Sequence, residues 1–243
     1  MSTLVAALRS AVTYVATLAY IAVAGPVGLV IVIGLRWKRG LYALGHTGVW
    51  LALTLSGIRY RVRGRERVPK GPVVFCSNHE SNVDPAVLFR ALHPQLHVLY
   101  KAELHRFPNM GTVFDAGGFV PVERENRERA LTSIARGTDS LRAGNSFLIF
   151  PEGTRSRTGD LLPFKKGGFV MAIKAQVPIV PVAVQGGRAA MRKGSAIVRS
   201  VHVSVRIGEP IPTVGLTVDD RDTLIERVRS GVRLLLDEGP IWT

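Results

Sequence analysis

A histidine and an aspartate lie five residues apart in a polar segment that directly follows an apolar run. His79 and Asp84 belong to segment 78–85, which reads Asn-His-Glu-Ser-Asn-Val-Asp-Pro. A loop of this length allows the carboxylate to accept a hydrogen bond from one imidazole nitrogen, and the other nitrogen can then take a proton from a substrate hydroxyl. Asp84 also precedes Pro85, an order typical of a helix N-cap. The pair predicts general-base chemistry, with helix capping as the alternative role of Asp84.

A second polar segment, 151–156, reads Pro-Glu-Gly-Thr-Arg-Ser and also follows an apolar run. Arg155 offers a planar fork of donors that suits a phosphate group, and Gly153 allows the backbone to approach a ligand closely. We expect Glu152 to orient Arg155 or to hold a substrate hydroxyl. The segment therefore predicts binding of a phosphorylated substrate, with a solvated surface turn as the alternative.

Three further basic residues occupy similar positions. Lys165 and Lys166 directly precede two glycines that open a predicted helix, and helix N-termini favour anions. Arg124 comes shortly after the apolar run 119–122. We expect all three residues to contribute to the same anionic-substrate site.

A sheet must position these loops, because short β-branched runs alternate with helical patterns after residue 67. The predicted strands are 73–76, 97–100, 119–122, 147–150, 179–184 and 201–207. The predicted helices are 85–92, 127–142, 167–175 and 220–236. This alternation predicts an α/β fold with a mixed, largely parallel sheet flanked by helices. Ligands of such sheets bind beyond the carboxyl ends of the strands, so we expect the polar loops to form one site.

The N-terminal part of the chain is strongly apolar. No charged residue occurs between residues 10 and 35, a run long enough to span a bilayer core as a helix. The Gly25-Pro26 step within it predicts a kink or a break. A basic and aromatic cluster at 36–39 follows, and then a second uncharged run at 41–58. These runs predict a membrane-associated helical hairpin.

Basic clusters on both sides of the second run constrain its topology. If both runs crossed the bilayer, the clusters at 36–39 and 59–67 would face opposite sides, against the preference of basic residues for the cytoplasmic face. We therefore expect one kinked or re-entrant element plus a shallow helix. Residues 1–58 would anchor a domain at 59–243 to the cytoplasmic face of the cell membrane, and the arginines of 59–67 would meet anionic lipid. A buried hairpin in a soluble protein is the alternative.

The overall composition favours a membrane surface over nucleic acid as the partner. The net charge of +14 implies anionic partners, but a mean hydropathy of +0.19 is unusual for a soluble nucleic-acid binder. The single cysteine, Cys76, rules out an internal disulfide and lies in an apolar run typical of the core. The histidines lack metal-site spacing, and no serine-nucleophile elbow or glycine-rich phosphate loop is present. We therefore expect neither a bound metal nor a cofactor.

Four segments together resemble the lysophosphatidate acyltransferase type of glycerolipid acyltransferases. In the family's order they are Asn78-His79-x4-Asp84, 118–124, 150–155 and 177–182. The resemblance runs from about residue 59 to residue 208, which is most of the expected domain. One departure is the Val-Pro-Val-Glu run ahead of Arg124, where many members have a more aliphatic run and an aspartate.

The resemblance implies that His79 is the general base and Asp84 its orienting partner. The implied reaction moves a fatty acyl group from acyl-CoA or an acyl carrier protein to the sn-2 hydroxyl of 1-acyl-glycerol-3-phosphate, giving phosphatidate for phospholipid biosynthesis. Glycerol-3-phosphate, another lysophospholipid or a lipid-linked sugar stay open as acceptors, and a non-catalytic protein that binds anionic membranes is the alternative from another class. The residues implied for the acceptor's phosphate and glycerol are Arg124, Glu152, Gly153, Thr154 and Arg155.

Overall fold

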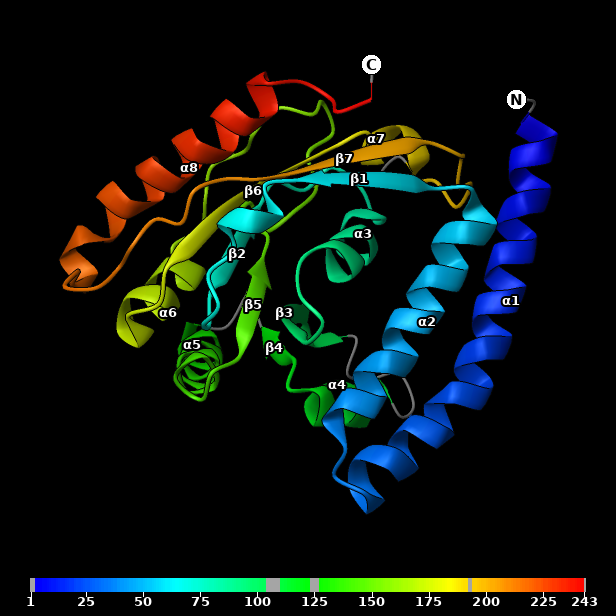
Figure 1. Cartoon of the computed structure of the whole chain (residues 1–243), viewed down its shortest axis with the longest axis horizontal. Helices are drawn as coiled ribbons and strands as arrows, with labels where there is room; N and C mark the ends of the chain where they lie inside the picture. Colours follow the sequence, from blue (N-terminus) through cyan, green and yellow to red (C-terminus); the bar gives the residue numbers. More distant parts are fainter. Residues whose placement is uncertain (1–2, 104–109, 123–126, 192–193, 243) are drawn as a thin grey trace.

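Seven strands form one sheet at the centre of the molecule (Figure 1). The computed structural model describes residues 3–103, 110–122, 127–191 and 194–242. The described strands lie in the order β1-β7-β6-β2-β5-β3-β4, and every pairing is parallel except that of β6 with β7. The prediction of a mixed, largely parallel sheet is confirmed. In chain order the strands are β1 Arg59–Arg63, β2 Val74–Ser77, β3 Leu96–Lys101, β4 Val120–Val122, β5 Ser146–Ile149, β6 Ile179–Gln185 and β7 His202–Ile207.

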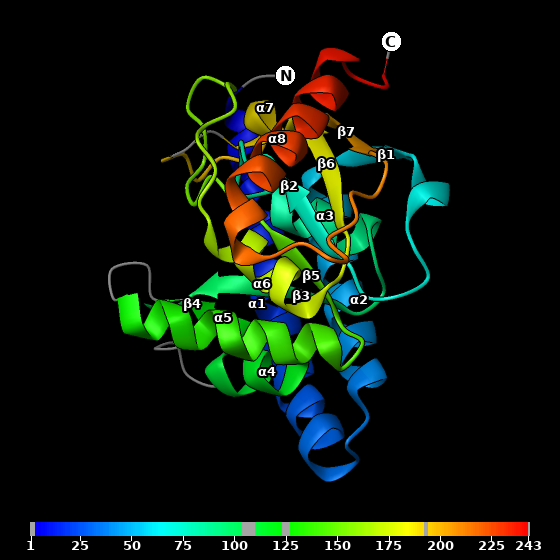
Figure 2. The same ribbon diagram turned by 90° about the vertical axis from the view of Figure 1, so that its left-hand side faces the viewer.

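Helices cover both faces of this sheet (Figure 2). The α-helices are α1 Thr3–Leu29, α2 Lys38–Ser56, α3 Asp84–Ala91, α4 Met110–Gly117, α5 Arg127–Arg142, α6 Gly167–Ala175, α7 Gly187–Ala190 and α8 Arg221–Asp237. Helices α5, α6 and α8 pack on one face, and α3 packs on the other with α2 beside it. Helix α1 lies outside α2 (Figure 1). The result is a sheet between two helical layers, as predicted.

The alternation of side chains along β2 explains how one strand serves two cores. Val74 and Cys76 point into the cluster formed with α5, α6 and α8, whereas Phe75 points into the cluster formed with α3. Successive strand side chains face opposite sides of a sheet. Cys76 is fully buried, and this burial raises the pKa of its thiol well above the ordinary value. It is a core residue, as its apolar surroundings predicted.

All six predicted strands and four predicted helices occur, with ends that differ by no more than one residue. Helices α4 and α7 and strand β1 were not predicted. Strand β1 is an edge strand beside β7, and its exposed arginines alternate with the partly buried Tyr60 and Val62. The guanidinium of Arg61 stacks on the ring of Trp242, 3.8 Å from its centroid. The run 59–67 therefore begins as a strand. The strand was not predicted, because its arginines were interpreted as a basic cluster and not as the exposed positions of a period-two pattern.

The N-terminal helices α1 and α2 form an antiparallel pair (Figure 1). Helix α1 continues through Pro26 and leads into a π-helical turn, Val30–Gly34. Of the predicted kink or break at Gly25-Pro26, the break does not occur, because a proline removes one backbone donor while the other hydrogen bonds of a 27-residue helix persist. The helical stretch Thr3–Gly34 is long and apolar enough to cross a membrane by length and composition.

Hydrogen bonds fasten both helices of this pair to the sheet domain. The Ser10 hydroxyl oxygen in α1 accepts a hydrogen bond from the backbone N–H of Val198 at 2.8 Å. The Tyr42 hydroxyl in α2 donates to the carbonyl of Gly117 at 2.9 Å. The helical pair therefore packs directly against the domain, and the functional division between 1–58 and 59–243 stays a prediction.

Candidate active site

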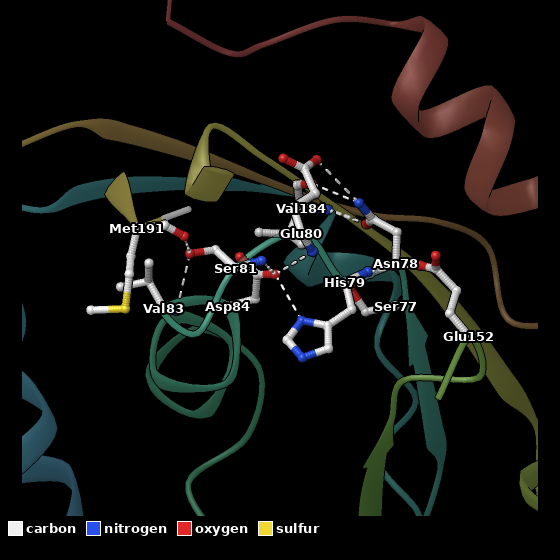
Figure 3. Close-up of polar contacts among 10 residues, drawn as sticks. All are labelled: Ser77, Asn78, His79, Glu80, Ser81, Val83, Asp84, Glu152, Val184 and Met191. Carbon is white, nitrogen blue, oxygen red and sulfur yellow. Dashed lines mark hydrogen bonds and ion pairs between the residues drawn. The ribbon is translucent and has the colours of Figure 1, made fainter. Parts of the chain in front are cut away.

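The loop between β2 and α3 brings His79 and Asp84 into direct contact (Figure 3). His79 Nδ1 lies 2.9 Å from Asp84 Oδ2. The same carboxylate oxygen accepts hydrogen bonds from the backbone N–H groups of Glu80 and Ser81, both at 2.7 Å. Asp84 is fully buried. These three donors take the place of water at Oδ2, whereas Oδ1 has no hydrogen-bond partner among the described residues. The loop thus holds a fixed acceptor against the imidazole.

Asp84 does not cap helix α3. The helix begins at Asp84 itself, its N-cap position is Val83, and no side chain makes a capping hydrogen bond there. The alternative role of Asp84 as a cap is wrong, because its carboxylate turns back onto the loop that precedes the helix. Only Pro85 follows the expected pattern, at the start of the helix.

The contact with Asp84 determines which nitrogen of His79 is basic. An ionised carboxylate only accepts hydrogen bonds, so Nδ1 carries the proton and Nε2 is the acceptor of the neutral ring. Nε2 points away from Asp84 (Figure 3). The Phe150 ring stacks on the imidazole, with 4.1 Å between the ring centroids. The His79 side chain remains 16% exposed, so a substrate can reach it.

Glu152 joins the two predicted site loops through backbone contacts. Its Oε1 accepts a hydrogen bond from the His79 backbone N–H at 2.8 Å, and its Oε2 accepts one from the Leu162 N–H at 3.0 Å. The Ser156 N–H donates to the His79 carbonyl at 2.8 Å. Burial raises the pKa of the Glu152 carboxyl, and the two backbone donors oppose that shift. Glu152 was expected to orient Arg155. It instead supports the His79 loop through these hydrogen bonds.

Arg155 and Lys165 supply positive charge at the same loop. Gly153 has a φ of +68°, and a Cβ built on it would lie only 2.8 Å from Lys165 Cε. The Lys165 side chain therefore packs on the loop backbone, where a larger residue than glycine would displace it. Arg155 Nη1 is buried and has no hydrogen-bond partner. A buried donor without a partner is costly, so an anion bound here would satisfy it.

Two other residues with predicted substrate contacts are placed differently. Lys166 Nζ forms an ion pair with Asp222 of α8, at 3.3 Å, and so points away from the loop. Arg124 lies outside the described residues. Thr154 is exposed within the second loop. The predicted residues that the structure gathers around these two loops are His79, Asp84, Glu152, Gly153, Thr154, Arg155 and Lys165.

Two polar residues of the His79 loop have roles that the sequence analysis did not foresee. The Asn78 side chain pairs with the backbone of Val184, accepting from its N–H at 2.8 Å and donating to its carbonyl at 2.9 Å. Glu80 is buried, and burial together with the nearby Asp84 raises the pKa of its carboxyl to about 7. Both residues lie within the Asn-His-Glu run, but nothing in the sequence distinguishes them from exposed loop residues.

Helix α7 is a further part of the site that was missed. A Cβ on Gly187 would overlap Asp84 Oδ1 and lie 3.3 Å from Ser81 Cβ. The Ser81 hydroxyl donates to the Met191 carbonyl at 2.8 Å. The only available signal was the Gly186-Gly187 pair at the end of a predicted strand, which permits close approach of another segment.

Comparison with known proteins agrees with this geometry. A family model described as Acyltransferase matches residues 59–185. The crystal structure of the 1-acyl-sn-glycerophosphate acyltransferase from Thermotoga maritima superposes with a TM-score of 0.86 and covers 100% of both chains. The sequence identity of that pair is 23%, so the match establishes a shared fold.

Sequence relatives narrow the family further. The human 1-acyl-sn-glycerol-3-phosphate acyltransferase beta is 36% identical over 179 residues, which are 73% of this chain and 64% of that protein. The 1-acyl-sn-glycerol-3-phosphate acyltransferase of Limnanthes douglasii is 34% identical over 207 residues, which are 83% of this chain and 73% of the plant protein. The chain therefore spans slightly less than two thirds of the length of the human relative. It belongs to the acyltransferase family, among the 1-acyl-sn-glycerol-3-phosphate acyltransferases.

Proposed function

We propose that this chain transfers a fatty acyl group from a thioester donor to the free sn-2 hydroxyl of 1-acyl-glycerol-3-phosphate, with His79 as the general base. The observation that supports this mechanism best is the 2.9 Å contact between His79 Nδ1 and Asp84 Oδ2. It leaves Nε2 as the basic atom of a partly exposed ring. The names of the relatives support the choice of acceptor.

The reaction begins when the acceptor hydroxyl gives its proton to His79 Nε2. The hydroxyl oxygen forms a bond to the thioester carbonyl carbon, and the carbonyl oxygen becomes an oxyanion. As the oxyanion collapses, the carbon–sulfur bond breaks and the leaving thiolate takes the proton from the imidazolium. The products are phosphatidate and a free thiol. Asp84 stays ionised throughout and stabilises the imidazolium, so the reaction requires no metal ion and no cofactor.

Arg155 and Lys165 bind the acceptor's phosphate in this proposal. The buried, unpartnered Arg155 Nη1 supports this role, as does the position of Lys165 against Gly153. By the family resemblance, Arg124 and Thr154 belong to the same acceptor site. Lys166 is left out of it because of its ion pair with Asp222.

The proposed reaction takes place at a membrane, where the acceptor resides. Helix α1 supports this location because large apolar side chains such as Leu8, Val15 and Leu18 are exposed on it. The net charge of +14 favours a surface of anionic lipid. The catalytic domain then faces the cytoplasm, with acyl-CoA or an acyl carrier protein as the donor.

Thiol release by the purified protein in lipid nanodiscs tests the function. The protein receives oleoyl-CoA with and without 1-acyl-glycerol-3-phosphate, and glycerol-3-phosphate and other lysophospholipids serve as competing acceptors. We expect thiol release that depends on 1-acyl-glycerol-3-phosphate, and a loss of roughly 100- to 10,000-fold in His79→Ala. His93→Ala serves as the matched control and keeps full activity, because this histidine follows the far end of α3, the end opposite Asp84.

Two outcomes contradict the proposal. Thiol release without any acceptor identifies a thioesterase instead. Unchanged activity in His79→Ala rules out this histidine as the base. If oleoyl-CoA gives no turnover with any acceptor, the same assay with an acylated carrier protein decides between the two donors.

A further inference from the structure

Helix α7 holds an arginine at the rim of the His79 site that the proposed chemistry has not used. Arg188 is the second residue of α7, and its side chain is exposed. Gly187, directly before it, packs against Asp84 and Ser81. The carboxyl group of Glu80, in the same loop, interacts electrostatically with Arg188. The backbone at Arg188 is therefore fixed to the loop that carries the general base.

The side chain of Arg188 reaches across to the second site loop. Its Nη1 donates a hydrogen bond to the Thr158 carbonyl and lies 3.7 Å from the position that a Cβ would take on Gly159. A guanidinium has five N–H donors, so this contact leaves most of them available. Among the residues that the structure describes, no carboxylate lies within ion-pair distance of this guanidinium. Arg188 is thus a preorganised cation beside the catalytic loop.

Acyl transfer between two phosphorylated substrates needs two cationic sites. The acceptor's phosphate is assigned above to Arg155 and Lys165, at the start of the second loop beside Gly153. Arg188 contacts the far end of the same loop, at Thr158 and Gly159. Both substrates must approach His79 Nε2 at once and therefore from different directions. Arg188 lies at the other end of the second loop from Arg155 and Lys165 and offers a separate cation for the second substrate.

We infer that Arg188 binds a phosphate group of the acyl donor, which carries its thioester on a phosphopantetheine arm. This inference rests on the acyl-transfer function proposed above. Coenzyme A and an acyl carrier protein share the phosphate at the end of that arm, and coenzyme A has further phosphates on its nucleotide. An arginine fork matches a phosphate oxygen pair by charge-assisted hydrogen bonds.

Direct binding tests the inference without relying on turnover. The probes are coenzyme A, phosphopantetheine and pantetheine, titrated by calorimetry into the nanodisc-embedded protein. The variants are Arg188→Gln, Arg188→Lys and the control Arg142→Gln. Arg142 is also an exposed arginine that donates to a backbone carbonyl, that of Lys174, but it precedes β5 at the end of the sheet opposite the site.

We expect Arg188→Gln to weaken coenzyme A binding about tenfold or more, the loss of a hydrogen bond to a charged group. Arg188→Lys should keep part of the affinity, Arg142→Gln all of it, and pantetheine binding should be the same in every variant. If Arg188→Gln weakens phosphopantetheine binding as much as coenzyme A binding, Arg188 binds the phosphate that both donors share. If phosphopantetheine binding is unchanged, Arg188 binds the nucleotide phosphates of coenzyme A.

Three results overturn the inference. In the first, the wild-type protein binds coenzyme A no better than pantetheine. In the second, Arg188→Gln weakens pantetheine as much as coenzyme A, which indicates a displaced loop. In the third, Arg188→Gln leaves coenzyme A binding unchanged and weakens binding of 1-acyl-glycerol-3-phosphate, which moves Arg188 to the acceptor site. A failure of the proposed function would instead appear as normal coenzyme A binding without acyl transfer.

Discussion

Three buried carboxyl groups lie in or against the His79 loop, and they differ in the hydrogen bonds that they accept. Asp84 accepts from three donors through one oxygen, and Glu152 accepts from two backbone N–H groups. The charged form of Glu80 is less well stabilised, because its donor Asn78 Nδ2 is 3.3 Å away and Asp84 carries a like charge nearby. Burial, and then the like charge of Asp84, raises the pKa of Glu80 to about 7.

Glu80→Gln should change how stability depends on pH. Between the ordinary value of 4.5 and the folded pKa of about 7, the folded protein holds a proton that the unfolded chain has lost. Wild-type stability therefore falls as pH rises through this window, by roughly 3 kcal/mol in total. Glutamine keeps the acceptor for Asn78 but cannot ionise, so the variant should melt higher than wild type at pH 8 and equally at pH 4.5.

Thermal melting in nanodiscs from pH 4.5 to pH 8 measures this difference. Glu226→Gln, an exposed glutamate of α8, is the control and should follow the wild-type curve. A wild-type curve that does not decline relative to Glu80→Gln between these pH values would mean that Glu80 ionises as an ordinary glutamate.

At the scale of elements, the site is held by packing between α7 and the β2–α3 loop. Helix α7 has only four residues, yet it contacts the loop through Gly187 and through the Met191 carbonyl that follows it. Strand β6 supports the loop from the same side, because Asn78 pairs with the backbone of Val184. Placement of Asp84 thus depends on residues more than 100 positions away in the chain.

Gly187→Ala should reduce activity strongly and stability moderately. The added methyl group would overlap Asp84 Oδ1, so Asp84 or α7 must move. A displacement near 1 Å in such a site costs roughly 100-fold in rate, and overpacking costs about 1–3 kcal/mol of stability. Turnover and melting temperature of the variant measure the two effects. Gly71→Ala, where nothing lies within 4 Å of the new Cβ, is the control, and equal turnover in both variants would refute tight packing at α7.

At the scale of the whole molecule, the α1–α2 pair gives the protein one apolar flank (Figure 1). Apolar side chains are exposed all along α1, whereas the sheet domain buries most of its own in two separate cores. Contacts of Ser10 and Tyr42 with the domain fix the direction in which this flank points. A surface of this kind marks an interaction with a membrane or with another protein.

Charged substitutions on α1 should abolish membrane binding. Leu18 and Val23 are 65% and 70% exposed, so Leu18→Asp with Val23→Asp removes no core contact but adds two charges to an apolar surface. We expect the double variant to lose flotation with anionic lipid vesicles while its circular dichroism stays unchanged. Leu234→Asp on α8, with 67% exposure in the wild type, is the matched control. Undiminished flotation of the double variant would exclude α1 as the membrane contact.

The sequence by itself determined most elements of the sheet domain and the residues of the catalytic pair. The period-two and helical patterns predicted the ends of these strands and helices to within one residue. They could do so because the order of apolar and polar residues reflects which side chains are buried. The spacing of His79 and Asp84 predicted their contact, because five residues close within one loop. Strand β1 was not predicted because its arginines were interpreted as a basic cluster. Helix α7 was not predicted because four residues are too few to show a helical period.

The tertiary structure alone decided how each polar side chain is used. It directs Asp84 away from helix capping, Glu152 to the His79 backbone, and Lys166 to Asp222. It also buries Glu80 and brings Arg188 to the rim of the site. These outcomes depend on segments that are distant in the chain and adjacent in space. A short polar side chain has several possible partners of equal chemistry, and only the packing of the backbone determines which one it meets.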